Sequence, residues 1–264
     1  MGFSLDNIEK TARAAAFAGA LQLERHFGHL TCVRSKSIAG DLVTEADEAS
    51  EKEILAVIRK DFPKHCVLSE ESGWQEAENA NALWVIDPLD GTTNYAHGYP
   101  IFAISIAFAF EGDVKVAVIY DPTRKELFSA IKNLGAYLNG TKIGVSNESR
   151  LEKSLLATGF PYDRKAKTGY DTNYPQFCNL TADSQGVRRG GAAALDLAYV
   201  AAGRLDGFWE SGLKPWDMAA GALLVEEAKG QVTTYAGKKF RLDAPNILAT
   251  NSHLHSFIAT YLMP

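Results

Sequence analysis

The sequence has few cysteines, no long apolar run and no excess of positive charge, and each shortage excludes a class of protein. Its cysteines, Cys32, Cys66 and Cys178, are odd in number and lack C-x-x-C spacing, which argues against a disulfide framework or a zinc site. No segment approaches the roughly 18 apolar residues of a membrane span, and no signal-peptide pattern is present. The net charge of −5 argues against a nucleic-acid binder. We therefore expect a cytoplasmic protein without a membrane partner or direct contact with nucleic acid.

The remaining composition is typical of a globular chain with a sizeable core. Apolar residues make up 46% of the sequence and charged residues 22%, values that are common among such proteins. A chain of 264 residues forms either one large domain or two small ones. Because the net charge is negative, an anionic substrate would need local cations to offset the carboxylates, which points to metal ions.

The first part of the chain combines two predicted helices with a predicted sheet. Apolar residues at helical spacing predict amphipathic helices over residues 4–30 and 44–62. Strand patterns fill residues 83–146, and the Asn-Gly pair at 139–140 predicts a type I′ hairpin. We therefore expect residues 1–146 to form an α+β half in which both helices pack on a mostly antiparallel sheet.

The second part of the chain alternates strands with helices. Strands are predicted over residues 155–158, 206–210, 232–235 and 247–250, and helices over residues 190–203, 215–229 and 254–262. Residues 147–264 are therefore expected to form an α/β half that shares a cleft with the first half.

The most informative segment runs from Trp84 to Tyr95. The apolar residues 83–86 end abruptly at Asp87, and Asp90 and a Gly-Thr-Thr turn follow. Carboxylates and a carbonyl are oxygen ligands for Mg²⁺, and backbone N–H groups that open a short helix can bind an anion. The segment can therefore bind a cation and a phosphate together. The alternative is an ordinary turn at the end of a strand, because Asp, Pro, Gly and Thr all favour turns.

Three further acids lie at the ends of predicted elements. Glu70 follows the short apolar strand 66–69, and it would share a sheet edge with Asp87 if the two strands are neighbours. Asp47 follows Thr44 by three residues, the spacing of a capping box. Asp217 lies in the first turn of a predicted helix. Taken singly, each acid has an ordinary structural role, as a surface charge or a helix cap.

Taken together, these segments resemble the inositol monophosphatase family of metal-dependent, lithium-sensitive sugar-phosphate phosphatases. The family's Glu-Glu segment is similar to residues 69–72, its central Asp-Pro-Leu-Asp-Gly-Thr-Thr-Asn motif to residues 84–95, and its C-terminal Trp-Asp motif to residues 216–221. Residues 187–206 resemble bacterial members. The resemblance runs nearly end to end. It implies a layered αβαβα sandwich of the sugar-phosphatase type, in the α+β / α/β class, and a homodimer.

The resemblance also implies a metal centre with two or three Mg²⁺ ions. Glu70, Asp87 and the Leu89 carbonyl would bind the first ion, and Asp87, Asp90 and Asp217 the second. Glu70 would also reach a weaker third ion or its water. Thr92, held by Asp47, would orient the water that attacks phosphorus, so that the expected catalytic residues are Thr92, Asp47 and Glu70.

A substrate site next to the metals is implied as well. The backbone of Gly91 and Thr92 would hold the phosphate, while Glu210 and residues 191–193 would face the sugar hydroxyls. The expected substrate contacts are Leu89, Asp90, Gly91, Thr92, Gly191, Ala192, Ala193, Glu210 and Asp217.

The expected reaction is Mg²⁺-dependent hydrolysis of a small polyol phosphate, with myo-inositol monophosphate as the primary candidate. Two metal ions neutralise the phosphate dianion and activate a bound water, and no Cys or His in these motifs is placed as a phosphoryl acceptor. Alternative substrates within the fold are fructose-1,6-bisphosphate, histidinol phosphate, NADP and phosphoadenosine phosphate. A different alternative is a regulatory protein that binds the transcription machinery, as some bacterial relatives do.

Several positions leave specificity open. Position 192 is often Thr or Ser in relatives but is Ala here, and Lys214 stands where bacterial relatives often carry Arg. Lys36, in a small polar loop, is either a third-metal residue or a solvated lysine. Arg188 and Arg189 read as an exposed basic pair, or else as an active-site or dimer-interface pair. The histidines that attract attention, His65, His97, His253 and His255, lie outside the motifs, so packing or surface roles are expected.

Overall fold

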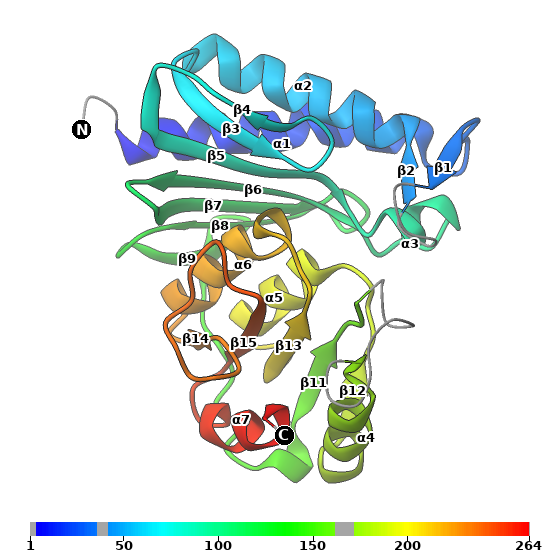
Figure 1. Ribbon diagram of the computed structural model, residues 1–264, viewed down its shortest axis with the longest axis vertical. Helices are drawn as coiled ribbons and strands as arrows, with labels where there is room; N and C mark the ends of the chain where they lie inside the picture. Colours follow the sequence, from blue (N-terminus) through cyan, green and yellow to red (C-terminus); the bar gives the residue numbers. More distant parts are fainter. Residues whose placement is uncertain (1–3, 36–41, 162–171, 264) are drawn as a thin grey trace.

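A computed structural model describes residues 4–35, 42–161 and 172–263, whose helices and sheets stack in αβαβα layers (Figure 1). In chain order the elements are α1 (Leu5–His26), β1 (Val33–Ser35), β2 (Leu42–Thr44), α2 (Glu45–Asp61), β3 (His65–Ser69), β4 (Gly73–Gln75), β5 (Asn79–Asp90), α3 (Thr92–Ala96), β6 (Ala103–Phe110), β7 (Asp113–Asp121), β8 (Glu126–Ile131), β9 (Gly135–Leu138), β10 (Thr141–Ile143), η1 (Leu151–Lys153), β11 (Leu155–Thr158), α4 (Tyr174–Asp183), β12 (Gly186–Arg188), α5 (Ala193–Ala201), β13 (Gly207–Ser211), α6 (Pro215–Glu227), β14 (Gln231–Thr233), β15 (Asn246–Thr250) and α7 (His255–Leu262). The layered sandwich predicted from the sequence is confirmed.

The larger sheet has eight strands in the order β10-β9-β8-β7-β6-β5-β3-β4. All its pairs are antiparallel except β3 with β5. Side chains alternate across β6: Ile104, Ile106 and Phe108 pack in the core under α1 and α2, while Ala103 and Ala107 belong to the core of α5 and α6. The small residues on the second face let helices approach closely, which brings the two halves together.

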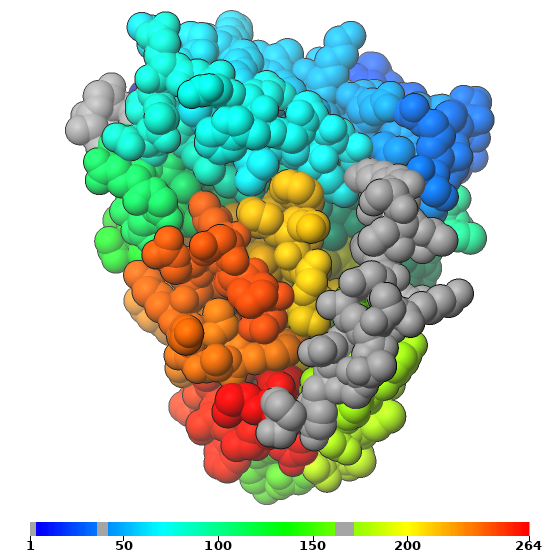
Figure 2. Space-filling view, viewed as in Figure 1, coloured from blue at the N-terminus to red at the C-terminus, as the bar shows by residue number. Residues whose placement is uncertain are grey.

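The smaller sheet has five strands in the order β12-β11-β13-β15-β14. The pairs of β11 with β12 and β13 are parallel, and the other two are antiparallel. Helices α5 and α6 lie between the two sheets, and α4 and α7 cover the outer face (Figure 1). In the space-filling view the yellow and orange segments lie directly below the cyan N-terminal layer, and the red C-terminal segment lies below them (Figure 2). One apolar core contains residues of both sheets. Division of the chain into two halves at residue 146 stays a prediction.

Local patterns account for the best-defined elements. Asn139 and Gly140 have φ angles of 49° and 80° and join Leu138 to Thr141 directly, which confirms the predicted type I′ hairpin. Both N-terminal helices form and pack against the larger sheet. Leu21, one of the apolar residues of the first helix, is 54% exposed. No helix in the described ranges is both long and apolar enough to cross a membrane.

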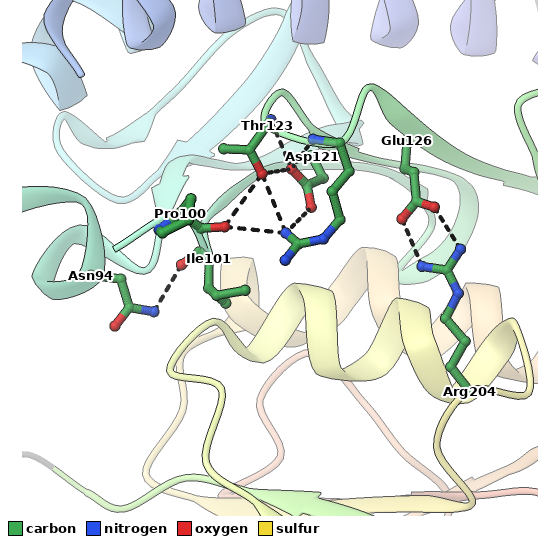
Figure 3. A network of polar contacts seen from close by, with 8 residues as sticks. Asn94, Pro100, Ile101, Asp121, Thr123, Glu126 and Arg204 are labelled. Atoms are coloured by element: carbon green, nitrogen blue, oxygen red, sulfur yellow. Dashed lines mark hydrogen bonds and ion pairs between the residues drawn. The ribbon is translucent and has the colours of Figure 1, made fainter. Parts of the chain in front are cut away.

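A side-chain contact between Arg204 and Glu126 ties the end of α5 to the larger sheet (Figure 3). Two guanidinium nitrogens donate to the two carboxylate oxygens over 2.7 and 2.5 Å. The guanidinium carbon also lies 5.0 Å from the ring centre of Tyr199. The planar fork and the stacking both require arginine.

We expect Arg204→Lys to lower the free energy of unfolding by about 1 kcal/mol, because lysine keeps the charge but loses the second hydrogen bond and the stacking. Urea denaturation measures the change. Arg241→Lys is the matched control: its pair with Asp243 is 81% and 79% exposed, so it should have almost no effect. Equal effects of the two substitutions would contradict the structural role of the fork.

Candidate active site

A cavity of about 210 Å³ opens where the ends of β5, β11 and β13 meet the first turns of α5 and α6. Its lining comes from both sheets and comprises Leu42, Glu70, Asp87, Leu89, Asp90, Gly91, Thr92, Thr158, Gly159, Phe160, Pro161, Arg189, Gly191, Ala192, Ala193, Asp196, Glu210, Ser211, Gly212, Leu213, Lys214, Trp216 and Asp217. Every residue predicted to bind metal or substrate is among them. Of the predicted catalytic residues, only Asp47 lies behind the wall.

Pairing of two parallel strands places the first acids side by side. Ser69 of β3 is opposite Ile86 of β5, and the Glu70 N–H donates to the Ile86 carbonyl over 3.1 Å. Glu70 and Asp87 therefore lie at the same edge of the sheet, as expected from the sequence for the case that the two strands are neighbours. Asp87 is 1% exposed, and its carboxylate accepts from the Leu89 N–H over 3.0 Å.

Two further acids lie near this edge, Asp90 at the end of β5 and Asp217 in the first turn of α6. The Asp90 carboxylate accepts from the Ala194 N–H over 2.8 Å, which ties the turn after β5 to the first turn of α5. The Asp217 carboxylate accepts from the Lys214 N–H over 2.7 Å, so it closes the first turn of α6. Asp217 therefore has the helix-start role expected of it and lines the cavity as well.

These carboxylates destabilise one another's charges. Burial, and then the charge of Glu70, raise the pKa values of Asp87 and Asp217 well above the ordinary range. Burial also raises the pKa of Asp90 to about 7. A cation among these oxygens would relieve the repulsion, and a set of donors made only of oxygen suits a hard ion such as Mg²⁺. The chemistry of the residues therefore fits the metal centre.

The carboxylates do not form a ready-made cage, however. Among the described residues, no group of three or more His, Cys, Asp or Glu side chains is arranged to hold a metal ion. Magnesium sites commonly use one or two carboxylates and complete their shell with water and substrate phosphate. The arrangement thus favours ions that are shared with a substrate over a closed structural site.

Thr92 and Asp47 form a buried pair at the start of α3. The Thr92 hydroxyl lies 3.0 Å from Asp47 Oδ1 and 3.1 Å from the Leu89 carbonyl oxygen, two acceptors for one hydrogen. Asp47 Oδ2 accepts from the Thr44 N–H over 2.8 Å and from its hydroxyl over 2.6 Å. The predicted capping box is therefore confirmed, and the same carboxylate also reaches Thr92. Burial raises the pKa of Asp47 to about 6.

Gly91 has to be glycine for two reasons. Its φ angle is 92°, in the left-handed region that side chains disfavour. A Cβ atom there would also lie 2.9 Å from the Ile101 carbonyl oxygen and 3.3 Å from that of Gly191. The Asn94 amide donates to the Ile101 carbonyl over 2.8 Å (Figure 3). It also donates to the Gly190 carbonyl over 2.9 Å. The backbone of the turn after β5 thus lies close to the segment before α5, and the Asn94 side chain joins the two.

The predicted substrate wall lies across from this turn. Residues 191–193 and Glu210 line the cavity together. Burial raises the pKa of Glu210 to about 8, while Arg189 lowers it and Asp217 raises it further. A Cβ atom on Gly159 would lie 2.1 Å from both Glu210 carboxylate oxygens. Only glycine at position 159 lets Glu210 keep its place in the wall.

Some residues at the site were not recognised from the sequence. Glu51 of α2 accepts hydrogen bonds from Ser69 and from the N–H groups of Glu71 and Ser72, so it fixes the turn that carries Glu70. No local pattern indicates this role. Asp196 lines the cavity as well. The sequence does contain a feature that could have identified it, because it is the one charged residue of the apolar helix α5.

Other candidates resolve into structural roles or fall outside the site. Arg188 and Arg189 are both exposed, but only Arg189 lines the cavity. Both buried histidines have packing roles: His65 stacks on Phe62 and accepts from the Trp84 indole, and His255 contacts Thr233 and Thr250. His97 and His253 are exposed. Lys36 lies outside the described residues.

Comparison with known proteins places this cavity among phosphatases. A model of the inositol monophosphatase family matches residues 4–263. The inositol-1-monophosphatase of Synechocystis sp. PCC 6803 is 48% identical over 95% of this chain and 87% of its own. The Nus factor SuhB of Pseudomonas aeruginosa is 46% identical over 96% of this chain and 94% of its own. The solved inositol monophosphatase of Anabaena sp. PCC 7120 superposes with a TM-score of 0.89 at 46% identity, covering 98% of this chain and 96% of that one.

More distant solved structures contain ligands. SaIMPase-II, 27% identical with a TM-score of 0.81 over 97% of this chain and 93% of its own, holds inositol monophosphate. An IMPase/NADP phosphatase, also 27% identical, with a TM-score of 0.86 over 99% of this chain and 97% of its own, holds NADP and Ca²⁺. Proteins with this fold thus bind phosphate esters of quite different size.

Proposed function

Because the chain belongs to the inositol monophosphatase family, we propose that it is a Mg²⁺-dependent phosphatase of a small polyol phosphate, with myo-inositol monophosphate as the primary candidate. The observation that carries this proposal is the meeting of Glu70, Asp87, Asp90 and Asp217 in one cavity, beside the buried Thr92–Asp47 pair. Oxygen ligands for a cation and a group that can orient water are both needed to hydrolyse a phosphate monoester.

The acids would hold two Mg²⁺ ions, with a weaker third ion near Glu70. Glu70, Asp87 and the Leu89 carbonyl would hold the first, and Asp87, Asp90 and Asp217 the second. Bound Mg²⁺ would offset the charge of the phosphate and lower the pKa of a water molecule. Asp87 would serve both ions, which agrees with the rise of its pKa by the charges of Glu70, Asp90 and Asp217.

Thr92 would aim the attacking water. When its hydrogen is donated to Asp47, the oxygen lone pairs remain free to accept a hydrogen bond from water. A threonine hydroxyl is too weak an acid to act as the base itself. Asp47 thus acts through Thr92, whose rotation it restricts, while the backbone at Gly91 and Thr92 would hold the phosphate.

Direct attack by water is favoured over a covalent intermediate. No cysteine or histidine occurs among the described residues that line the cavity, so the usual phosphoryl acceptors of those types are absent from this wall. Positioning and electrostatic stabilisation then carry most of the catalysis, as in other phosphoryl transfers.

The experiment that tests the proposal is a phosphate-release screen with Mg²⁺ and with EDTA. The panel comprises inositol monophosphate, fructose-1,6-bisphosphate, histidinol phosphate, NADP and phosphoadenosine phosphate. We expect the highest kcat/KM with inositol monophosphate and no release in EDTA. Failure to release phosphate from any of these esters would refute the enzymatic proposal.

A second candidate function rests on the names of relatives. Several proteins with 41–47% identity are called Nus factor SuhB, so contact with the transcription machinery is a specific alternative. The intact acids at every matched position favour catalysis without opposing a second role. A pulldown at physiological salt tests that alternative, and sedimentation tests the expected homodimer.

A further inference from the structure

Asp196 is a buried acid for which the fold provides no partner. It is 6% exposed and lines the cavity. Its carboxylate lies against Gly190, where a Cβ atom would come within 2.8 Å of Oδ1. Within the described ranges, no hydrogen bond or ion pair reaches this carboxylate. A buried carboxylate without a partner is costly, so its interaction partner is expected in the cavity.

Two charged residues near Asp196 limit the chemistry of a group that could bind to its carboxylate. Glu210 and Arg189 also line the cavity, and Arg189 folds so closely over Gly191 that a Cβ atom there would lie 2.6 Å from its Nη1. Burial raises the pKa of Asp196 well above its ordinary range, Glu210 and Asp90 add to the rise, and Arg189 opposes it. The positive charge of Arg189 therefore lowers the pKa values of both Asp196 and Glu210 and opposes the effect of burial.

This combination suits neighbouring hydroxyl groups. A hydroxyl donates one hydrogen bond and accepts others, so it can donate to a carboxylate and accept from a guanidinium at once. Two carboxylates beside one guanidinium can thus bind two adjacent hydroxyls. A second phosphate group would meet two acids there and only one cation.

We propose that Asp196 contacts the substrate by accepting a hydrogen bond from the hydroxyl next to the one that reaches Glu210. The inference rests on the proposed phosphatase function and narrows its substrate class. The preferred ester carries two adjacent free hydroxyls, as a cyclitol or a sugar does. A bisphosphate is then a poor substrate, because its second phosphate faces the acids.

The test compares myo-inositol 1-phosphate with n-propyl phosphate, which has no hydroxyl group. For Asp196→Ala we expect kcat/KM to fall about 10- to 100-fold with the inositol ester, because a buried substrate hydroxyl then loses its hydrogen-bond acceptor. The value for propyl phosphate should not change. Asp196→Asn keeps an oxygen acceptor, so it should lose less activity with the inositol ester and use fructose-1,6-bisphosphate relatively better.

Glu227→Gln is the matched control. Glu227 is a buried acid of the adjacent helix α6, 7% exposed, whose carboxylate accepts from the N–H groups of Asn133 and Gly135 over 2.8 Å. It does not line the cavity. Its substitution should therefore change kcat/KM for both esters by the same factor.

The outcomes separate the inference from the function on which it rests. If Asp196→Ala lowers kcat/KM for both esters by the same factor, the residue is structural and the inference is overturned. If that variant does not fold, an unchanged preference of Asp196→Asn among the three esters overturns it. A wild-type enzyme that uses both monoesters equally keeps the phosphatase function and overturns the inference. A wild-type enzyme that uses neither overturns both.

Discussion

Replacing Asp90 with asparagine is expected to lower Mg²⁺-dependent phosphate release at least about 1000-fold, or about 4 kcal/mol in activation free energy. Asparagine keeps the shape and an oxygen that can accept from the Ala194 N–H, the contact that Asp90 makes over 2.8 Å. It loses the negative charge that a cation requires. Substitution of a residue that only hydrogen-bonds to a metal ligand already lowers metal affinity or activity about 10- to 100-fold. Loss of the charge of a ligand itself should therefore lower activity more.

The same variant should be more stable than the wild type at pH 8 in EDTA. Burial raises the pKa of Asp90 to about 7 in the folded protein, above the value of about 4 in an unfolded chain. Stability is therefore lost as the pH rises between these values, because folding opposes ionisation. Asparagine cannot ionise and removes this loss. Thermal unfolding in EDTA and in Mg²⁺ measures both parts of the prediction.

Asp121→Asn is the matched control for Asp90→Asn, because it replaces a buried acid that is not expected to bind metal. Asp121 is fully buried and accepts from the N–H groups of Thr123 and Arg124 over 2.8 and 3.0 Å (Figure 3). Its substitution should reduce stability and leave the Mg²⁺ dependence of turnover unchanged. Near-normal turnover in Asp90→Asn would contradict the assignment of Asp90 as a metal ligand.

The elements that could be predicted are those that one periodicity defines. The Asn-Gly hairpin at 139–140 and the helices that bury an apolar stripe were predicted correctly. Helix α4 (Tyr174–Asp183) was missed because only Gln176 and Leu180 are buried on it, so no apolar stripe marks it in the sequence. The three-residue edge strand β12 (Gly186–Arg188) has no pattern long enough to detect.

The candidate site depends on contacts between distant residues, which periodicity does not contain. Asp90 and Ala194 are 104 positions apart, yet a hydrogen bond joins them. From the sequence, Glu70 and Asp87 were expected to share an edge if their strands were neighbours. The structure meets that condition, because β3 and β5 are paired in parallel and parallel neighbours end on the same side. The meeting of that edge with α5 and α6 followed only from the family resemblance. Asp196 matched no motif. It is the one charged residue of the apolar helix α5, but only the packing of that residue against Gly190 shows its place in the wall.

Replacing Thr92 with alanine should lower kcat about 100- to 1000-fold and change KM little, because proton transfer and water positioning typically contribute factors of this size. The hydroxyl lies 3.0 Å from Asp47 Oδ1, and Thr92 is 8% exposed. The Thr92 hydroxyl is therefore restricted to few orientations. A group that aims the attacking water acts in the transition state more than in substrate binding, so its loss belongs in kcat.

Thr92→Ser tests whether the hydroxyl or the side-chain volume matters. Serine keeps the oxygen that can donate to Asp47 and accept from water, so it should recover most of the kcat that alanine loses. Removing the methyl group alone loosens the rotation of the hydroxyl, so recovery should be incomplete. A pure rise in KM for Thr92→Ala, or equal losses in the serine and alanine variants, would show that Thr92 supports the turn and does not aim water. Steady-state kinetics on all three proteins at saturating Mg²⁺ distinguishes these cases. The contacts of Asp47 with Thr44 over 2.8 and 2.6 Å do not involve Thr92, so we expect them to remain in both variants.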